Sequence, residues 1–590
     1  MSLPDLPVSS QTDVLVVGVG PAGGTAAMCL AKLGVDVLFI TKYRWTANTP
    51  RAHITNQRSM EVFRDHGIED RVALDATPHH LMGDTVFCTA LAGEELGRIH
   101  TWGTGPDRQG DYESASPTMN CDIPQTYLEP IILRRAVELG ARALFSTEYL
   151  GHEQDEDGVT THLRDRVTGH EYLVRSKYLI GADGARSEIA KEIGLSFEGR
   201  MDVAGSMNII FKADLSQLVE SRHSVLYWVL RPGANIGGIG MGLLRMVRPW
   251  NEWLIVWGYD ISQPAPELTE ADAIRIARDL IGIPDLPIEI VSYNLWGNND
   301  MYATTLSNGR VFCMGDAIHR HPPSNGLGSN TSVQDAYNLA WKIAYVLKGW
   351  AGPGLLDSYT PERAPVAKRI VTRANKSSGE FAPAFEALGV LDTSDPVQMQ
   401  RNIDSRKDAS AEGAARRAAL RVAMELKNYE FNALGVELGQ FYESGAIVPD
   451  GTEPPAPRRD PDLYYEPSTV PGSHLPHAWL LDASGRKVST LDAAGSGVFS
   501  VFTGINGATA WRPAAEAASA ELGVPILVNV VGPGQELEDP YFDWARLSDI
   551  EEDGVLLVRP DKHVAFRCRQ GVPDAAAMLR EALRAILARA

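Results

Sequence analysis

The chain begins with a strand–turn–helix pattern that strongly restricts its fold. From Asp13 it reads DVLVVGVGPAGGTAAMCLAKLGVDVLFI: an apolar strand, a glycine-rich turn, a helix, a glycine stop at Gly34 and a second apolar strand. Gly18, Gly20 and Gly23 have the spacing of a dinucleotide-binding fingerprint. The first glycine permits the turn, the second lets the backbone approach a pyrophosphate, and the third lets helix and strand pack closely. The pattern predicts an α/β fold that binds a dinucleotide.

The end of the second strand departs from this pattern. An acidic residue usually stands there and binds the ribose hydroxyls of the adenosine, whereas this chain has Thr41-Lys42-Tyr43-Arg44. Either a 2′-phosphate is bound, or basic and stacking groups hold the adenosine end of an FAD. The rest of the chain favours the second interpretation, with Lys42 and Arg44 as the basic groups.

Two further turns follow predicted strands. GADGARS begins at Gly181 and places Asp183 after the strand-like YLI; GDAIHRHPPSNGLGSN begins at Gly315 and precedes a helix that we expect to open near Asn330. An open helix N-terminus offers unpaired N–H groups and a partial positive charge, which suit an anionic or electron-rich ligand group. Asp316 is well placed to accept hydrogen bonds from ribityl hydroxyls. Together with the N-terminal fingerprint, these turns predict a flavin held end to end.

Composition restricts the partners. The 590 residues include 55 Lys and Arg against 75 Asp and Glu, a net charge of −20, which repels phosphate backbones and anionic membranes, so we expect no nucleic-acid or membrane partner. Five scattered cysteines without a CxxC argue against a disulfide framework or a zinc site. His319 and His321 lack a third ligand nearby, so we expect no metal. No secretory leader or apolar run of about 18 residues is present, which predicts a cytoplasmic protein. We expect a homo-oligomer, a dimer or tetramer.

In this order and context, the three motifs resemble those of the single-component flavoprotein aromatic hydroxylases, the group that includes p-hydroxybenzoate hydroxylase and phenol hydroxylase. Four segments are similar in particular to the bacterial ortho-hydroxylating phenol monooxygenases, such as 2-hydroxybiphenyl 3-monooxygenase and 2,4-dichlorophenol 6-monooxygenase. They are YRWTANTPRAHITNQRSMEVFRDHGIED, SVLYWVLRPGA, RMVRPWNEW and GDAIHRHPPSNGLGSNTSVQDAYNLAWKIA. The resemblance covers nearly the whole chain. It implies NAD(P)H- and O2-dependent ortho-hydroxylation of a substituted phenol to a catechol through a flavin C4a-hydroperoxide.

The resemblance also implies a Rossmann-like FAD domain of the p-hydroxybenzoate hydroxylase type, interrupted by a substrate-domain β-sheet and followed by a thioredoxin-like domain. Without a CxxC, the last domain is expected to serve packing or dimerisation rather than dithiol chemistry. The expected boundaries are 1–80, 118–197 and 301–375 for the FAD domain, 81–117 and 198–300 for the substrate domain, 376–465 for a helical segment and linker, and 466–590 for the thioredoxin-like domain.

The expected chemistry needs a base, because a phenolate attacks from its ortho carbon far better than a phenol, which titrates at about pH 10. By the resemblance, His53 in PRAHITNQ is the candidate base, and Asp122 in NCDIPQTYLEP orients it or assists proton transfer. The run GGIGMG (237–242) is followed by a strand-like RMV, so we interpret it as sheet backbone near a ligand rather than a second nucleotide site. NADH or NADPH is therefore expected to bind transiently on the surface, with Arg245 as its candidate contact and a surface salt bridge as the alternative.

The resemblance implies the remaining site residues. Trp102 and Trp228 are expected as walls of the substrate pocket, and Pro322 at the edge of both pocket and flavin. Two alternative functions stay open: hydroxylation of a larger polycyclic phenol or aromatic acid, and flavin binding without turnover. The expected FAD contacts are Gly18, Gly20, Gly23, Lys42, Arg44, Arg51, Gln125, Asp183, Asp316, Pro322, Gly326, Gly328, Ser329 and Asn330.

Overall fold

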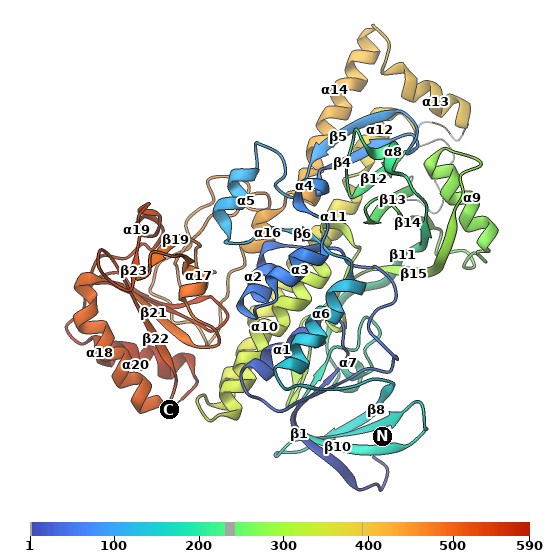
Figure 1. Cartoon of the computed structure of the whole chain (residues 1–590). Coiled ribbons are helices and arrows are strands. Elements are labelled where there is room, and N and C mark those ends of the chain that lie inside the picture. Colours follow the sequence, from blue (N-terminus) through green and yellow to red (C-terminus); the bar gives the residue numbers. More distant parts are fainter. Residues whose placement is uncertain (1–2, 231–241, 392, 394, 590) are drawn as a thin grey trace.

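Three large β-sheets organise the described part of the chain, and each occupies its own region in Figure 1. The computed structural model describes residues 3–230, 242–391, 393 and 395–589. Helices cover or flank every sheet, so the expected α/β class is confirmed. Of the glycine-rich run 237–242, only Gly242 is among the described residues, where it begins a strand.

The first sheet carries the N-terminal fingerprint. Its middle strands are parallel, and the parts that pair at its centre, such as β2 and the last four residues of β1, are apolar and buried in the core shared with α1 (Pro21–Lys32) and α10 (Leu327–Leu347). Helix α1 follows the first strand and packs against α6 (Gln125–Glu138) and α10. The strands are β16 (Ser307–Asn308), β17 (Val311–Cys313), β10 (Glu171–Gly181), β1 (Val8–Val17), β2 (Val37–Ile40) and β7 (Arg142–Leu144) in spatial order, with β8 (Thr147–Gln154) and β9 (Val159–Asp165) beside β10.

The second sheet lies at the upper right of Figure 1 and is largely antiparallel. Helix α9 (Glu270–Ile281) packs on one of its faces. Its edge strand β18 comes from the segment that follows Gly315, so this sheet reaches the expected flavin-binding turn. The strands in spatial order are β18 (His319–Arg320), β15 (Glu289–Ala303), β11 (Phe197–Lys212), β14 (Glu252–Tyr259), β13 (Gly242–Arg248), β12 (Leu226–Val229), β4 (Asp84–Cys88) and β5 (Glu95–His100).

A short two-stranded sheet, formed by β3 (Ile54–Thr55) and β6 (Cys121–Asp122), contains Asp122 and begins directly after His53. It aligns the segment that contains His53 with the one that contains Asp122. Helix α4 (His79–Met82) contacts β6, and α10 contacts β3. The other helices of this part of the sequence are α2 (Gln57–Asp65), α3 (Glu69–Asp75) and α5 (Gln109–Ala115).

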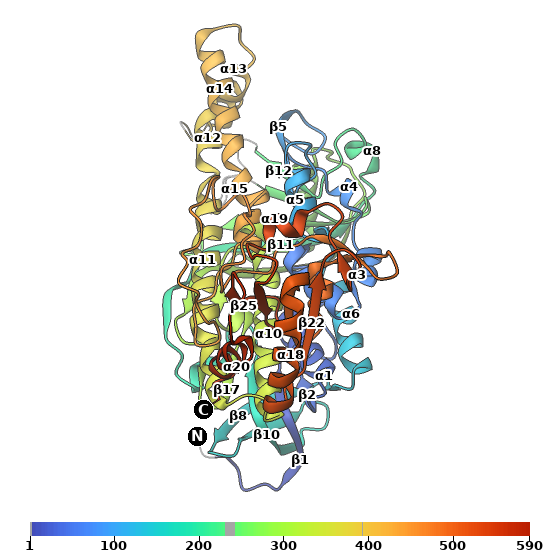
Figure 2. The ribbon, with the colours of Figure 1, turned by 90° about the vertical axis from the view of Figure 1, so that its left-hand side faces the viewer.

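Helices occupy most of the segment between the second and third sheets. The long helix α11 (Tyr359–Gly379) leads to a pair, α13 and α14, that projects beyond the second sheet at the top of Figure 2. Among the described residues, no helix is long and apolar enough to cross a bilayer. The remaining helices of this segment are α12 (Ala382–Leu388), α13 (Pro396–Ser405), α14 (Ala411–Leu426), α15 (Asn428–Phe431) and α16 (Leu434–Leu438).

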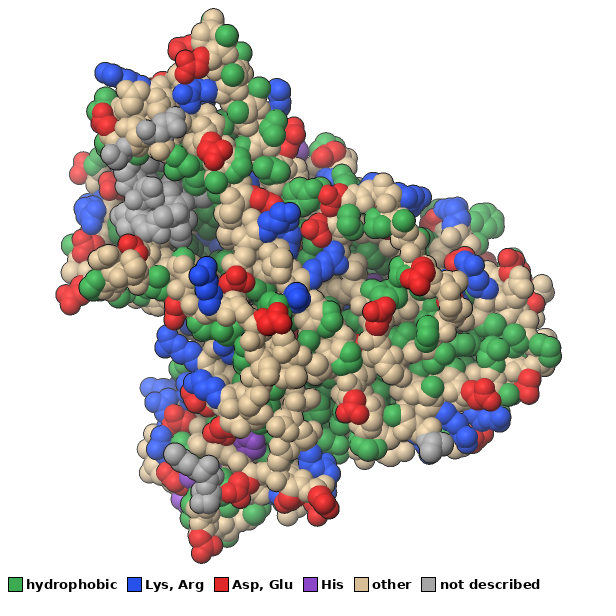
Figure 3. All heavy atoms as spheres, turned by 180° about the vertical axis from the view of Figure 1, so that it is seen from behind, with side chains coloured by type: hydrophobic (Ala, Val, Ile, Leu, Met, Phe, Trp, Pro, Cys, Tyr) green, Lys and Arg blue, Asp and Glu red, His purple; other side chains and the backbone are tan. Residues whose placement is uncertain are grey.

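The third sheet forms the C-terminal unit. Helices α18 (Ile505–Leu522) and α20 (Ala575–Ile586) pack together, and their apolar side chains share a core with α10 and α11. The C-terminal unit is therefore fused to the fingerprint-bearing part of the molecule. On the face shown in Figure 3, acidic and basic side chains are interspersed. The strands in spatial order are β20 (Lys487–Ser489), β19 (Trp479–Asp482), β23 (Leu537–Glu538), β22 (Ile526–Val531), β21 (Phe499–Gly504), β24 (Val555–Val558) and β25 (Val564–Cys568).

Candidate active site

The fingerprint glycines differ in what surrounds them. A Cβ on Gly18 would lie 2.0 Å from the carbonyl oxygen of Ala182, and one on Gly23 would lie 2.0 Å from that of Gly18, so both positions require glycine for close packing. Gly20 instead has an open side, where the nearest atom to such a Cβ is Oε1 of Glu129 at 3.7 Å. Gly20 precedes α1, whose first N–H groups have no side-chain cap. These N–H groups and the open space beside them fit a pyrophosphate.

The turn at Gly315 presents a free carboxylate. Gly315 has φ +64°, and the next residue, Asp316, is exposed and accepts no side-chain hydrogen bond from the described residues. Helix α10 begins at Leu327, one turn earlier than expected, because Gly326 adopts a left-handed conformation (φ +63°) that turns the chain into the helix. Its N-terminus is also uncapped, and Gly328 has open space on its Cα side apart from His321 at 3.5 Å. This arrangement fits the ribityl chain and polar end of a flavin.

The side chain of Asn330 joins the start of α10 to the β3 segment. Its Nδ2 donates to the carbonyl of Ile54 at 2.8 Å, and its Oδ1 accepts the N–H of Asn56 at 2.9 Å. The side-chain amide is therefore occupied by the β3 segment. It fixes the start of α10 against the segment that carries His53. Ser329 is half-buried beside it, and Pro322 is buried with its carbonyl oxygen 2.6 Å from Nδ1 of His321.

Asp183 caps a helix in this structure. One carboxylate oxygen accepts the hydroxyl of Ser187 at 2.6 Å and the other accepts the N–H of Glu188 at 2.9 Å, at the start of α7 (Glu188–Glu192). Burial raises the pKa of Asp183, against the lowering effect of these hydrogen bonds. The contacts give this carboxylate a structural role at the turn, and its contact with FAD stays a prediction.

The basic residues after β2 are accessible. Lys42, Arg44 and Arg51 are all exposed, and Arg51 donates from Nε to Oγ1 of Thr49 at 3.2 Å. Gln125 is half-buried at the start of α6, where its Nε2 donates to Glu129 at 2.6 Å. Glu129 links Gln125 to the open side of Gly20: its Oε1, which accepts Gln125, is the atom nearest to a Cβ on Gly20, and its Oε2 accepts the N–H of Ala47.

His53, Asp122 and Arg245 meet in the protein interior. Their exposed fractions are 4%, 0% and 7%. Nδ1 of His53 lies 3.5 Å from Oδ1 of Asp122, and the other oxygen of Asp122 forms an ion pair with Arg245. Nε2 of His53 lies 2.9 Å from the carbonyl oxygen of Pro50 and must carry a proton to bond it. Nδ1 is therefore the basic atom of neutral His53.

The pKa shifts in this cluster follow from burial and charge. Burial lowers the pKa of His53, and Arg245 lowers it further, against the raising effect of Asp122. Burial alone would raise the pKa of Asp122, but Arg245 and His53 outweigh it, so that pKa is lowered. At neutral pH the cluster thus holds a neutral imidazole beside an ionised carboxylate, which suits a group that takes up a proton.

The position of Arg245 corrects one expectation. It was expected at a surface that meets the nicotinamide cofactor, or in a surface salt bridge, but its side chain is buried against Asp122. The reason is its place on β13, where it is paired with Leu226 and Leu254 inside the second sheet. Nε of Arg245 has no hydrogen-bond partner among the described residues.

The two expected pocket tryptophans pack on residues that the sequence did not single out. Trp102 is buried and meets Phe431 edge-on at 5.6 Å between ring centroids; half-buried Trp228 lies 4.5 Å from Phe381. Nζ of Lys427 is 3.3 Å from the centroid of Phe381. Phe381, Phe431 and Lys427 come from a helical segment whose sequence shows charge and helix formers but no pattern that marks a pocket wall.

No cluster of three metal-binding side chains occurs among the residues that the structure describes. His319, which the sequence placed two positions from His321, uses Nε2 to contact Asp335 at 3.0 Å. The carboxylate of Asp335 and the guanidinium of Arg363 beside it were also absent from the sequence-based set of site residues, because their contacts join segments far apart in the chain.

Comparison with known proteins agrees with this geometry. Residues 11–374 match the family described as FAD binding domain, and residues 468–590 match the one described as aromatic-ring hydroxylase, C-terminal. Phenol 2-monooxygenase of Pseudomonas sp. (strain EST1001) is 56% identical over 96% of this chain and 91% of its own length. The 2,4-dichlorophenol 6-monooxygenase of Cupriavidus pinatubonensis is 54% identical over 98% and 97%.

A solved structure is similar throughout. The flavin-dependent monooxygenase PieE, in complex with FAD and substrate, superimposes with a TM-score of 0.94 at 42% identity and covers 99% of this chain and all of its own. Family matches, relatives and architecture agree with the open pyrophosphate cradle at Gly20 and the free carboxylate of Asp316. The chain belongs to the FAD-dependent aromatic-ring hydroxylases.

Proposed function

We propose that this enzyme hydroxylates a substituted monocyclic phenol ortho to its hydroxyl group and releases a catechol, using O2 and NADH or NADPH. The observation that carries the proposal is the contact between His53 and Asp122. Nδ1 of His53 and Oδ1 of Asp122 lie 3.5 Å apart, and both atoms are buried. Neither accepts a hydrogen bond from the described residues. A phenol hydroxyl is a donor of the kind that this pair lacks.

Bound FAD would supply the redox chemistry, taking electrons from the nicotinamide cofactor and activating O2. The chain's own residues prepare the ring. His53 accepts the phenolic proton at Nδ1, which makes the ortho carbon electron-rich. Asp122 stabilises the charge that His53 then carries, and Arg245 holds Asp122 in place. Trp102 and Trp228 form apolar walls that exclude water from the ring.

The same proposal assigns the cofactor contacts. Lys42 and Arg44 would hold the adenosine end, and Arg51 and Gln125 would lie beside the middle of FAD; the accessibility of the three basic side chains supports this. Asp316 would bind the ribityl chain. Arg245 would meet NADH or NADPH only if its side chain became accessible. The proposed domain division keeps 1–80, 118–197 and 301–375 for FAD, 81–117 and 198–300 for substrate, 376–465 as helical linker and 466–590 as the C-terminal domain.

The two alternatives are less well supported. Curated relatives that share more than half of their residues with this chain are named for phenol and dichlorophenol, which favours a small phenol over a polycyclic one. Those relatives are also enzymes, which speaks against a flavin-binding module without turnover. We also propose a cytosolic location, which the five free cysteines support, and a homo-oligomeric state, a dimer or tetramer.

A panel of substituted phenols tests the proposal, with each compound paired with its methyl ether. We expect phenols to stimulate NADH or NADPH oxidation and to yield catechols hydroxylated ortho to the existing hydroxyl. The ethers have the same ring but no proton to give to His53, so they should yield little product. Equal hydroxylation of ether and phenol would overturn the proposal.

A further inference from the structure

The turn of the last hairpin is buried in the FAD-binding part of the chain. Residues 559–563 (RPDKH) join β24 to β25, and all five are buried, with Arg559 0% and Asp561 1% exposed. Connecting turns normally lie at the surface, where water satisfies their polar groups. Here the carbonyl of Asp561 accepts Nη2 of Arg58 at 2.8 Å, and the carbonyl of Pro560 accepts the hydroxyl of Tyr337 at 3.2 Å. The turn is an inserted tip whose partners belong to α2 and α10.

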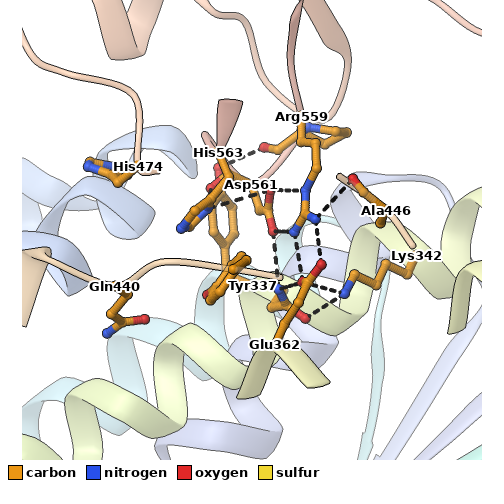
Figure 4. Close-up of polar contacts among 12 residues, drawn as sticks. Tyr337, Lys342, Glu362, Gln440, Ala446, His474, Arg559, Asp561 and His563 are labelled. Atoms are coloured by element: carbon orange, nitrogen blue, oxygen red, sulfur yellow. Dashed lines mark hydrogen bonds and ion pairs between the residues drawn. The ribbon is translucent and has the colours of Figure 1, made fainter. Parts of the chain in front are cut away.

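Arg559 is the centre of this contact (Figure 4). Its Nη1 and Nη2 donate to Oε1 and Oε2 of Glu362 in α11 at 2.6 and 2.9 Å. Lys342 of α10 donates to the same carboxylate at 2.7 Å, and Asp561 contacts Nε of Arg559 at 3.0 Å. A two-pronged contact of this kind fixes orientation as well as distance. Removal of either partner would leave a buried charge uncompensated.

Arg363, which follows Glu362 in α11, is connected to the turn at Gly315 through Asp335. Nε of Arg363 donates to Oδ1 of Asp335 in α10 at 2.7 Å. Oδ2 of Asp335 accepts the N–H of Gly315 at 3.1 Å and lies 3.0 Å from Nε2 of His319. These side chains are fully or almost fully buried. Asp335 thus holds both ends of the turn that presents the free carboxylate of Asp316.

We propose that Asp335 is a positioning residue for FAD, and that the C-terminal domain acts on the cofactor site through it. Arg559 holds Glu362 in place, and this fixes the position of the adjacent Arg363 in α11. Arg363 in turn orients the carboxylate of Asp335, which holds the Gly315 turn. The C-terminal domain favours the FAD-binding form of this turn from a distance. Because such coupling is reciprocal, bound FAD must stabilise the inserted tip by the same factor.

A double-mutant cycle on the full-length apoenzyme tests the connection. The variants are Asp335→Asn, Arg559→Lys and the pair together, and the readout is the Kd for FAD from flavin fluorescence titration. We expect each single variant to raise the Kd about tenfold or more, and the double variant to raise it by clearly less than the product of the two. Arg512→Lys is the matched control, because Arg512 pairs with Glu536 on the exposed side of the same domain and should leave the Kd unchanged.

Unchanged FAD affinity in Arg559→Lys, or effects that multiply, would overturn the coupling. Circular dichroism separates lost folding from lost affinity. If the variants do not fold, hydrogen exchange of the unmodified protein decides: FAD should slow exchange in 559–563 as well as in 315–321, and leave α9 unchanged. Protection of 315–321 without protection of 559–563 would also refute the proposal.

Discussion

Nδ1 of His53 lies 3.5 Å from Oδ1 of Asp122, and both atoms are buried without a hydrogen donor among the described residues. Because Nε2 of His53 is engaged by the carbonyl of Pro50, its proton is fixed there and Nδ1 carries the lone pair. Two acceptors face each other at a distance that a shared hydroxyl would bridge. The pair is therefore arranged to receive one proton donor.

Replacement of the base should separate cofactor binding from chemistry. His53→Ala removes Nδ1 but none of the groups placed at the pyrophosphate or ribityl positions. We expect it to retain FAD and to lose hydroxylation by about 10²–10⁴-fold, the usual contribution of a general base. Flavin absorbance and the rate of catechol formation measure the two effects. His100→Ala, at a histidine that is 56% exposed, is the control and should behave as the unmodified enzyme; undiminished turnover of His53→Ala across the pH range would contradict the base assignment.

The acid limb of the pH profile should move in opposite directions in two variants. His53 must be neutral to act, and its pKa is lowered, so kcat/KM for the phenol should fall only as pH drops through a value below 6.5. Asp122→Asn removes a charge that raises this pKa and should move the limb to lower pH. Arg245→Met removes a charge that lowers it and should move the limb to higher pH.

The pH profiles of the three enzymes measure these shifts. Shifts in the same direction, or no shift, would show that His53 is not the titrating base. The KM for NADH or NADPH in Arg245→Met is a separate readout. A rise would support contact between Arg245 and the nicotinamide cofactor, and an unchanged KM would oppose it.

Local physical constraints explain why so much of the architecture could be predicted. Gly18 has a positive φ, and a Cβ there would lie 2.0 Å from the carbonyl oxygen of Ala182. Only glycine fits this turn, so the sequence alone predicts the turn. Buried parallel strands, such as β2 and the second half of β1, appear in the sequence as apolar runs. The pairing of His53 with Asp122 came from the resemblance to a family and not from local pattern.

The remaining features depend on contacts between distant segments. Asn330 bonds the backbone of Ile54, 276 residues away, and Arg559 bonds Glu362, 197 residues away. A buried asparagine or arginine looks the same in sequence as one at the surface. The sequence around Arg245 likewise predicts a strand, but it does not show that Asp122 lies against this side chain and that both are buried.

Two glycines of the fingerprint should fail in different ways when replaced. Gly18→Ala puts a Cβ 2.0 Å from the backbone of Ala182 at φ +116°, so we expect a poorly folded protein. Gly20→Ala meets no atom closer than 3.7 Å, so the apoenzyme should fold with nearly unchanged thermal stability while FAD affinity falls sharply, because the methyl group occupies the pyrophosphate space. Thermal midpoints and FAD titration distinguish the two. Full FAD affinity in Gly20→Ala would mean that the pyrophosphate lies elsewhere.

Glu437 should make stability depend on pH. It is 4% exposed in α16, its Oε2 has no hydrogen-bond partner among the described residues, and burial raises its pKa from 4.5 to about 7. Between pH 4.5 and pH 7, the folded protein therefore keeps a proton on Glu437 that the unfolded chain has lost. The contribution of neutral Glu437 to stability is complete below pH 4.5 and disappears as the pH rises through 7.

Glu437→Gln keeps a neutral side chain of the same shape at every pH. The variant should match the unmodified enzyme in acid and exceed it above pH 8, by up to about 3 kcal/mol from a shift of this size. Calorimetric melting at pH 4 and pH 8 measures the difference, with Glu443→Gln, at an exposed position, as control. The same pH dependence of melting in Glu437→Gln and the unmodified enzyme would show that Glu437 is ionised in the folded protein.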